Sequence, residues 1–499
     1  MVYNSTRGGE TNRTASEAIL EGLCSDGGLF MPDHILTFER PVVELKDMSY
    51  QELAYEVMKL YFTDFTEEEL RHCIDAAYDE KFDTKLIAPL VKKDNAYFLE
   101  LFHGKTIAFK DMALSILPHL MVTSAKKNNV KDKIVILTAT SGDTGKAAMA
   151  GFSDVSGTEI IVFYPYGGVS RFQELQMRTE PGWNTHAVAI RGNFDDAQTG
   201  VKRIFGDTAF REHLRETAGV RLSSANSINI GRLVPQIVYY VYSYCQLLRS
   251  GEIALGEGIN VCVPTGNFGN ILAAKLAKEM GLPVKKLICA SNENKVLTDF
   301  FGTGVYNRER PFILTTSPSM DILISSNLER LLYFTVDQDT KEVQALMEAL
   351  AEKGEYRITD GMRAHMQDFY GGFAKEEAVA GTIKALFDKT GYVIDPHTAV
   401  AKTVYDAYVK ETGDMTKTVI ASTASPFKFA PSVISALGGN GNLDDVFAVI
   451  DMLSEKAGVK EPAAVSEVRT AQIRHNTICE LKDMEDVTEE FLIEDREKF

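Results

Sequence analysis

The stretch that decides the fold reads GINVCVPTGNFGN over residues 258–270 and continues as ILAAKLAKEMG over residues 271–281. An apolar, β-branched run comes first, and a glycine-containing loop separates it from an Ala/Leu-rich run with helical spacing. This order predicts a buried strand, a tight loop and a helix. Because the backbone N–H groups at the start of such a helix converge, the loop can bind an anion.

The loop after this strand is therefore a candidate phosphate-binding site. Its residues are Gly266, Asn267, Phe268, Gly269 and Asn270. The loop lacks the Lys-Ser/Thr ending of a Walker loop and the glycine spacing of a dinucleotide-binding loop, which makes NTP and NAD poorer ligands. Taken alone, the loop is interpreted equally well as a tight turn that binds nothing.

The same order of strand, polar loop and helix recurs elsewhere in the chain. It appears at KIVILTAT (133–140), EIIVFYPYGG (159–168) and TVIASTAS (418–425). Such repetition predicts parallel strands joined by crossover helices that cover both faces of a sheet. Residues 49–78 instead carry apolar positions at helical spacing, which predicts a pair of amphipathic helices. We expect an α/β fold with an N-terminal helical portion.

Length and composition narrow the class of protein. The chain has 499 residues, enough for two or three domains, and its 53 Lys and Arg against 70 Asp and Glu give a net charge of −17. This charge disfavours nucleic acid or an anionic membrane as the main partner. Six cysteines without a C-x-x-C pair argue against a zinc site or a disulfide scaffold. The sequence has neither a signal-peptide pattern nor an apolar run of the ~20 residues that span a bilayer, so we expect a cytoplasmic protein.

Lys110 is the candidate for covalent chemistry, in the segment GKTIAFKDMALSIL. A lysine among apolar residues can have the pKa of its ammonium lowered by desolvation, and such an amine is suited to Schiff-base formation and proton transfer. The alternative is an ordinary surface lysine in the first turn of a helix. Considered without other motifs, the segment favours that alternative.

Three further polar loops are candidate ligand-binding sites. Residues 141–145 (SGDTG) can present hydroxyl and N–H groups to a carboxylate or phosphate, although helix capping by Ser141 or Asp143 explains them equally well. Residues 223–232 (SSANSINIGR) can clamp a phosphate through Arg232, or form a plain polar loop. Residues 422–426 can place a hydroxyl against a ring nitrogen, or simply turn the chain. A lysine and several anion-binding loops together are the parts that a phosphate-bearing aldehyde cofactor needs.

The sequence resembles the threonine synthase family nearly from end to end. The segments that carry the resemblance occur in the order typical of that family: GGLFMPD, ELFHGKTIAFKDMA, LTATSGDTGKAA, NSINIGRL, VPTGNFGN, DPHTAVA and ASTASPFKF. Several long motifs in one order are far more specific than a single glycine-rich loop.

The resemblance implies a pyridoxal 5′-phosphate enzyme of the tryptophan-synthase-β-like group, with fold type II. Lys110 would hold the cofactor as a Schiff base and act as the catalytic base, and no metal is implied. The cofactor phosphate would lie on the loop Thr265, Gly266, Asn267, Phe268, Gly269 and Asn270. Thr423 resembles the partner of the pyridine nitrogen, and Asp143 the neighbour of the 3′-oxygen.

The resemblance also implies the reaction. O-phospho-L-homoserine and water would give L-threonine and phosphate by γ-elimination and β-addition, on a protein that is a monomer or a homodimer. The residues that would contact the substrate are Ser141, Gly142, Thr144, Asn226, Asn229 and Arg232.

The expected domains follow from this fold type, in which the cofactor lies between two α/β domains. We expect a mainly helical domain over residues 1–95. The large cofactor-binding domain would combine residues 96–130 with 235–499, and the small α/β domain would comprise residues 131–234.

Two positions depart from the family pattern. Lys105 stands where many relatives carry proline, and Ser425 stands where some carry histidine, which bears on the surroundings of the ring nitrogen. Two alternative functions stay open. One is a related phospho-lyase that yields 2-oxobutyrate, and the other is a threonine-synthase-like binding protein without catalysis.

Overall fold

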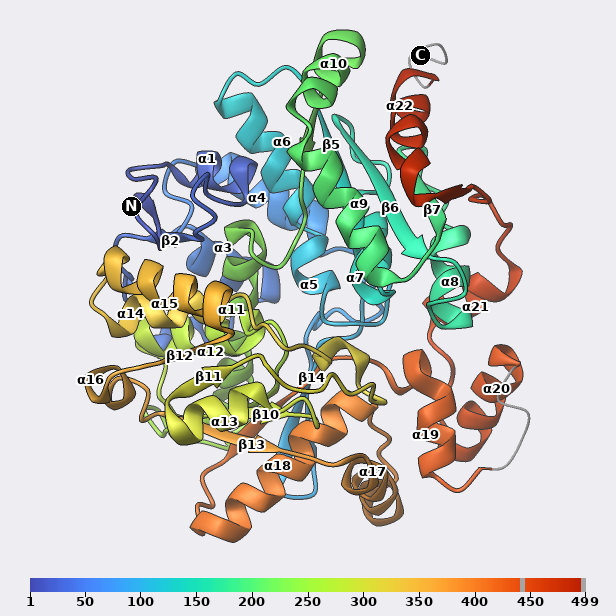
Figure 1. Ribbon diagram of the computed structural model, residues 1–499. Coiled ribbons are helices and arrows are strands. Elements are labelled where there is room, and N and C mark those ends of the chain that lie inside the picture. Colours follow the sequence, from blue (N-terminus) through green and yellow to red (C-terminus); the bar gives the residue numbers. More distant parts are fainter. Residues whose placement is uncertain (440–444, 495–499) are drawn as a thin grey trace.

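The computed structural model describes residues 1–439 and 445–494, which form two large sheets with helices around them and two short two-stranded sheets (Figure 1). Residues 440–444 and 495–499, which fall within the expected large domain, lie outside the described part. Within that part, none of the helices combines the length and apolar character needed to cross a bilayer.

The larger sheet has six strands in the order β13-β10-β9-β14-β4-β3. All neighbours are parallel except β3 and β4. Its strands are β3 (Leu90–Lys93), β4 (Ala96–Glu100), β9 (Ile259–Pro264), β10 (Val284–Ser291), β13 (Phe369–Phe373) and β14 (Thr418–Ser422).

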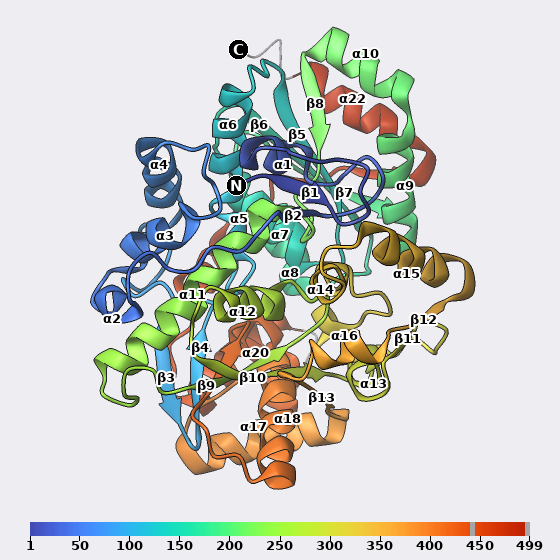
Figure 2. The ribbon, with the colours of Figure 1, turned by 90° about the vertical axis from the view of Figure 1, so that its left-hand side faces the viewer.

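Both faces of this sheet are covered, as a parallel sheet requires. Along β9, Val261 and Val263 pack in one core cluster with α11 (Ile230–Arg249) and α12 (Gly269–Glu279). Cys262 faces the opposite cluster, which contains α18 (Pro396–Thr412). Figure 2 shows α11 and α12 on one side of the strands and α17 (Glu376–Thr390) and α18 on the other. The strand predicted over residues 258–264 is therefore β9, a buried strand between β10 and β14 in the interior of the sheet.

The smaller sheet has five parallel strands in the order β15-β7-β6-β5-β8. The strands are β5 (Lys133–Ala139), β6 (Thr158–Pro165), β7 (Thr185–Arg191), β8 (Val220–Ser223) and β15 (Ile478–Glu480). Alternate residues of β5 face α7 (Asp143–Phe152) or the cluster formed with α9 (Phe194–Gly206). We expected residues 235–499 to belong entirely to the large domain, which is built on the six-stranded sheet and is called the larger unit below. Instead, β15 pairs with β7 of the five-stranded sheet, the smaller unit, and α22 (Met484–Glu494) packs beside β15.

The N-terminal portion is mainly helical. Capping boxes begin α3 (Tyr50–Met58) at Ser49 and α4 (Glu67–Ala77) at Thr66, which explains why the acidic run 67–69 lies at a helix start. Helix α1 (Ala15–Glu21) packs on α6 (Leu117–Lys127), and α3 packs on α11.

The remaining elements connect or flank these units. They are β1 (Tyr3–Ser5), β2 (Phe30–Pro32), α2 (Val42–Leu45), α5 (Asp111–Leu114), α8 (Arg171–Arg178), α10 (Thr208–Ala218), α13 (Val296–Thr303), β11 (Val305–Asn307), η1 (Pro318–Met320), α14 (Leu328–Thr335), α15 (Thr340–Lys353), β12 (Glu355–Arg357), α16 (Asp360–Ala364), α17 (Glu376–Thr390), η2 (Pro426–Phe429), α19 (Ala430–Ala436), α20 (Val446–Ala457), α21 (Ala463–Thr470) and η3 (Leu481–Asp483).

Candidate active site

The candidate site lies where loops at the carboxyl ends of strands from both sheets meet, the usual place for ligands in parallel α/β proteins. The backbone before Lys110 is fixed there by the loop after β14. Ala108 and Ala424 form an antiparallel bridge, and Phe109 N donates to Thr423 O at 2.8 Å. The two predicted cofactor contacts, Lys110 and Thr423, are thereby brought close together.

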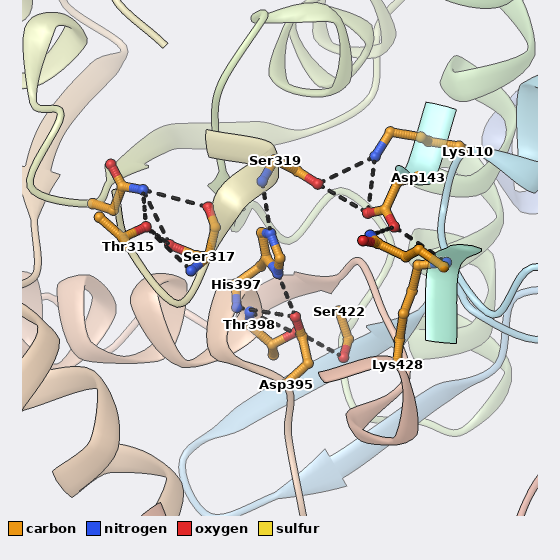
Figure 3. Close-up of polar contacts among 12 residues, drawn as sticks. Lys110, Asp143, Thr315, Ser317, Ser319, Asp395, His397, Thr398, Ser422 and Lys428 are labelled. Atoms are coloured by element: carbon orange, nitrogen blue, oxygen red, sulfur yellow. Dashed lines mark hydrogen bonds and ion pairs between the residues drawn. The ribbon is translucent and has the colours of Figure 1, made fainter. Parts of the chain in front are cut away.

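The side chain of Lys110 points into the protein, with only 11% of its surface exposed (Figure 3). Its Nζ lies 3.4 Å from Asp143 Oδ2 and 3.3 Å from Ser319 Oγ. Burial lowers the pKa of Lys110, and although Asp143 opposes this, the positive charges of Lys428 and Arg232 add to it. These surroundings are not those of a surface lysine.

Asp143, the first residue of α7, is buried, and two lysines lie close to its carboxyl group. Lys428 and Lys110 hold the pKa of Asp143 well below its usual range, although burial alone would raise it. Gln173 Nε2 donates to Oδ1 at 2.8 Å, and Ser319 Oγ donates to Oδ2 at 3.0 Å. Both oxygens therefore have partners on other segments.

The start of α7 is capped by a residue that the sequence did not indicate. Thr140 Oγ1 accepts from Gly142 N at 3.0 Å and from Gly145 N at 2.9 Å. The alternative that Ser141 or Asp143 caps this helix is therefore wrong. Ser141 is exposed and Thr144 is half-buried, so neither hydroxyl is sequestered in the core.

Gly142 adopts a backbone conformation that favours glycine. Its φ is +138°, and a Cβ there would lie 2.5 Å from the amide of Gln173. Only glycine lets Gln173 reach Asp143 in this way.

Side-chain hydrogen bonds to backbone carbonyl oxygens fix the predicted phosphate loop. Thr265 is buried, and its Oγ1 donates to Val263 O at 2.8 Å. Ser325 Oγ donates to Gly266 O at 2.6 Å, and Asn327 Nδ2 donates to Asn267 O at 3.1 Å. These bonds fix the carbonyl oxygens of the loop, which leads directly into the N-terminus of α12.

This loop has a strained backbone and one buried donor that is unpaired within the described ranges of the chain. Phe268, at the start of α12, has φ +68°, which is unusual for a residue other than glycine. Tyr239 OH donates to Asn270 Oδ1 at 2.8 Å, yet Asn270 Nδ2 is buried and has no partner among the described residues. A buried donor without a partner is costly, and an anionic ligand would relieve that cost.

Arg232 shows the same feature. It is buried and donates from Nη1 to Ala225 O at 2.9 Å, while its Nε has no partner among the described residues. Burial lowers the pKa of Arg232 to about 10, which leaves it charged at neutral pH. It is thus a buried cation without a carboxylate in direct contact among the described residues, as a phosphate clamp requires.

The other two residues predicted for this clamp are placed differently. Asn229 is the N-cap of α11: its Oδ1 accepts from Gly231 N at 2.8 Å, and its Nδ2 donates to Ile19 O at 2.9 Å. Its amide is therefore committed to the backbone. Asn226 is exposed at the surface of the same loop. Of the three, Arg232 has the strongest case for direct ligand contact.

Several residues of the site carried no predicted role. Ser319 N donates to His397 Nε2 at 3.3 Å, and the other ring nitrogen, Nδ1, lies 2.7 Å from Asp395 Oδ2 (Figure 3). Because Nε2 accepts, Nδ1 carries the hydrogen. Asp395 and His397 belong to the DPHTAVA motif, which was quoted for the resemblance without a role. Ser319 had no sequence signal.

A separate cavity of about 220 Å³ lies behind α5. Its lining includes Lys105, Asp111 and His119 but neither Lys110 nor Asp143, so it is not the candidate site. Lys105, one of the two departures from the family pattern, therefore lies on this cavity.

Two largely parallel α/β sheets, with Lys110 where their strand ends meet, form the fold type II architecture, and the expected fold class is confirmed. Family models described as "Threonine synthase N terminus" and "Threonine synthase, C-terminal" match residues 2–78 and 398–473. Threonine synthase from Saccharomyces cerevisiae is 34% identical, over 94% of this chain and 97% of that protein. The chain belongs to the threonine synthase family.

Two further relatives bear on the comparison. The structure of a PLP-bound threonine synthase from Brucella melitensis superposes with a TM-score of 0.86 at 34% identity, covering 99% of this chain and 98% of that one. Human threonine synthase-like 1 is 42% identical over 85% of this chain, but the chain spans only 58% of that protein's length.

Proposed function

We propose that the chain is a threonine synthase that converts O-phospho-L-homoserine and water into L-threonine and phosphate with pyridoxal 5′-phosphate. The observation that carries the proposal is the largely buried amine of Lys110, which faces Asp143 at the start of α7. The relatives that are named threonine synthases cover nearly the whole chain and support the same reaction.

The residues present fit the cofactor. Lys110 would hold it covalently, and its phosphate would lie on residues 265–270, where the buried Nδ2 of Asn270 has no partner in the described part of the chain. Thr423 would face the ring nitrogen and Asp143 the 3′-oxygen. When bound, the cofactor supplies an electron sink for the charge that develops at the substrate Cα.

The chain's own residues would move the protons and hold the substrate. Lys110, with its lowered pKa, can take the Cα proton as a neutral amine, and Asp143 lies close enough to orient it. Arg232 would bind the phosphate of the substrate, with Ser141, Gly142 and Thr144 facing its polar groups. Asn226 and Asn229 would shape that loop. We also propose that the chain acts in the cytoplasm as a monomer or homodimer, without nucleic acid or membrane partners.

The test is product analysis. Purified chain with pyridoxal phosphate is incubated with O-phospho-L-homoserine, and threonine, 2-oxobutyrate and phosphate are measured. Equal amounts of threonine and phosphate are expected. Phosphate with 2-oxobutyrate and no threonine would identify a phospho-lyase instead, and no turnover at all would favour the binding protein.

A further inference from the structure

Lys428 is a buried lysine that joins the two units beside the candidate site. It lies on η2, directly after β14, and none of its side-chain surface is exposed. Its Nζ donates to Thr106 O at 2.9 Å, within the Lys110 segment, and to Gln176 Oε1 at 3.4 Å on α8. A buried ammonium needs such partners, because desolvation of an unpaired charge is very costly.

The third partner of Lys428 is the carboxylate of Asp143, at 3.2 Å from Oδ1. Gln173 binds the same oxygen, whereas Lys110 and Ser319 bind Oδ2. Oδ1 of Asp143 therefore faces Lys428 and Gln173, and Oδ2 faces Lys110 and Ser319. Of the two partners of Oδ1, Lys428 is the charged one.

We propose that Lys428 is a positioning residue that orients Asp143 and places a second positive charge beside Lys110, which favours the uncharged, nucleophilic form of the Lys110 amine. The inference rests on the proposed function, since it assigns a role within that site. Lys428 acts through Asp143 and through its own charge and need not touch the substrate.

The charges around the site give the sign of the effect. Lys110 interacts electrostatically with Asp143, Lys428 and Arg232, and Asp143 interacts in the same way with His397. Asp111, whose pKa burial raises, is the other carboxyl close to Lys428. Loss of the charge on Lys428 removes a repulsion from the Lys110 ammonium. Among the described residues it also leaves Lys110 as the one lysine in direct contact with Asp143, so the pKa of Lys110 rises.

The experiment follows covalent attachment of pyridoxal phosphate to cofactor-free protein as a function of pH, which needs no turnover. The absorbance change gives the rate, and borohydride trapping identifies the lysine. In Lys428→Met the pH at half-maximal rate should move upward by about one unit or more. Lys428→Arg, the matched control, keeps the charge and should stay near the unchanged chain. Asp143→Asn should move the midpoint in the opposite direction.

The outcomes separate this inference from the proposed function. An unshifted or lowered midpoint in folded Lys428→Met would overturn the role of Lys428 while leaving the cofactor assignment intact. Absence of any covalent link in the unchanged chain would overturn the cofactor assignment itself, and this inference with it. If circular dichroism shows that the Met variant is unfolded, Lys428→Gln, which retains a donor for the Thr106 carbonyl, makes the same test.

Discussion

Two buried carboxylates form ion pairs that involve α7, one with a single lysine and the other with two. Lys146 pairs with Glu180 in a direct buried contact within the smaller unit. Asp143, less than one turn earlier, is shared between Lys110 at 3.4 Å and Lys428 at 3.2 Å, both from segments of the other unit. A balanced one-to-one pair stabilises a fold. A carboxylate that faces two lysines neutralises only one of the two positive charges, so the protonated form of one amine is disfavoured. An amine that gives up its proton more easily is suited to act as a nucleophile or base.

The largest effect is expected from a substitution of Lys110, the lysine that shares Asp143 with Lys428. Lys110→Ala should abolish the covalent link and lower turnover by about 10²–10⁴-fold or more, because both the anchor and the base are lost. Steady-state assays and absorbance spectra measure this. Residues 265–270 should still retain free cofactor. Substantial turnover in this variant would refute the role of Lys110.

The balanced pair should respond in the opposite way. Lys146→Met leaves Glu180 charged and buried, which should cost about 3–5 kcal/mol of stability. Urea unfolding of the cofactor-free protein measures the loss. Attachment of pyridoxal phosphate per folded molecule should be retained. Lost attachment with unchanged stability would show that the two pairs do not differ as described.

Gly142 lies beside Asp143, and its backbone conformation lets Gln173 contact that carboxylate. Gly142→Ala should cost about 1–3 kcal/mol, because φ is +138° and the new Cβ would displace Gln173 from Asp143. The unfolding midpoint and the attachment rate should fall together. Gly381→Ala, on α17 with no atom within 4 Å of the new Cβ, is the matched control and should not destabilise the protein. Equal effects of the two variants would contradict this account.

The smallest expected effect lies at His103, just before the Lys110 segment. Although burial opposes it, hydrogen bonds to Asp83 and Glu100 raise the pKa of His103 to about 9. A raised pKa stabilises the fold below the unfolded value of about 6.5, and the gain is lost as pH rises through about 9. His103→Gln should therefore cost about 1–2 kcal/mol at pH 6 and little at pH 10, as measured by urea unfolding. A pH-independent difference would exclude this cause.

Much of the fold followed from local patterns. The strand, loop and helix at residues 258–281 were predictable because β-branched runs, glycines and Ala/Leu-rich segments act within a few residues. Strand β15 was not, since three residues ending in glutamate give no strand period and their pairing with β7 depends on the tertiary structure.

The site was predictable where a motif marks a backbone position. Lys110 and residues 265–270 are of that kind. The partners of Asp143 are not, because Ser319 and Lys428 follow it by 176 and 285 positions in the sequence, and no spacing rule connects such distant segments. Asn229 shows the reverse, since a polar residue that looks like a ligand in the sequence is a helix cap in the structure.

The most direct test of the central claim is borohydride reduction of the protein loaded with pyridoxal phosphate, followed by peptide mapping. The account predicts that the label lies on Lys110 alone, although Lys146 and Lys428 are also buried near the site. Label on either of those lysines, or on none of the three, would contradict it.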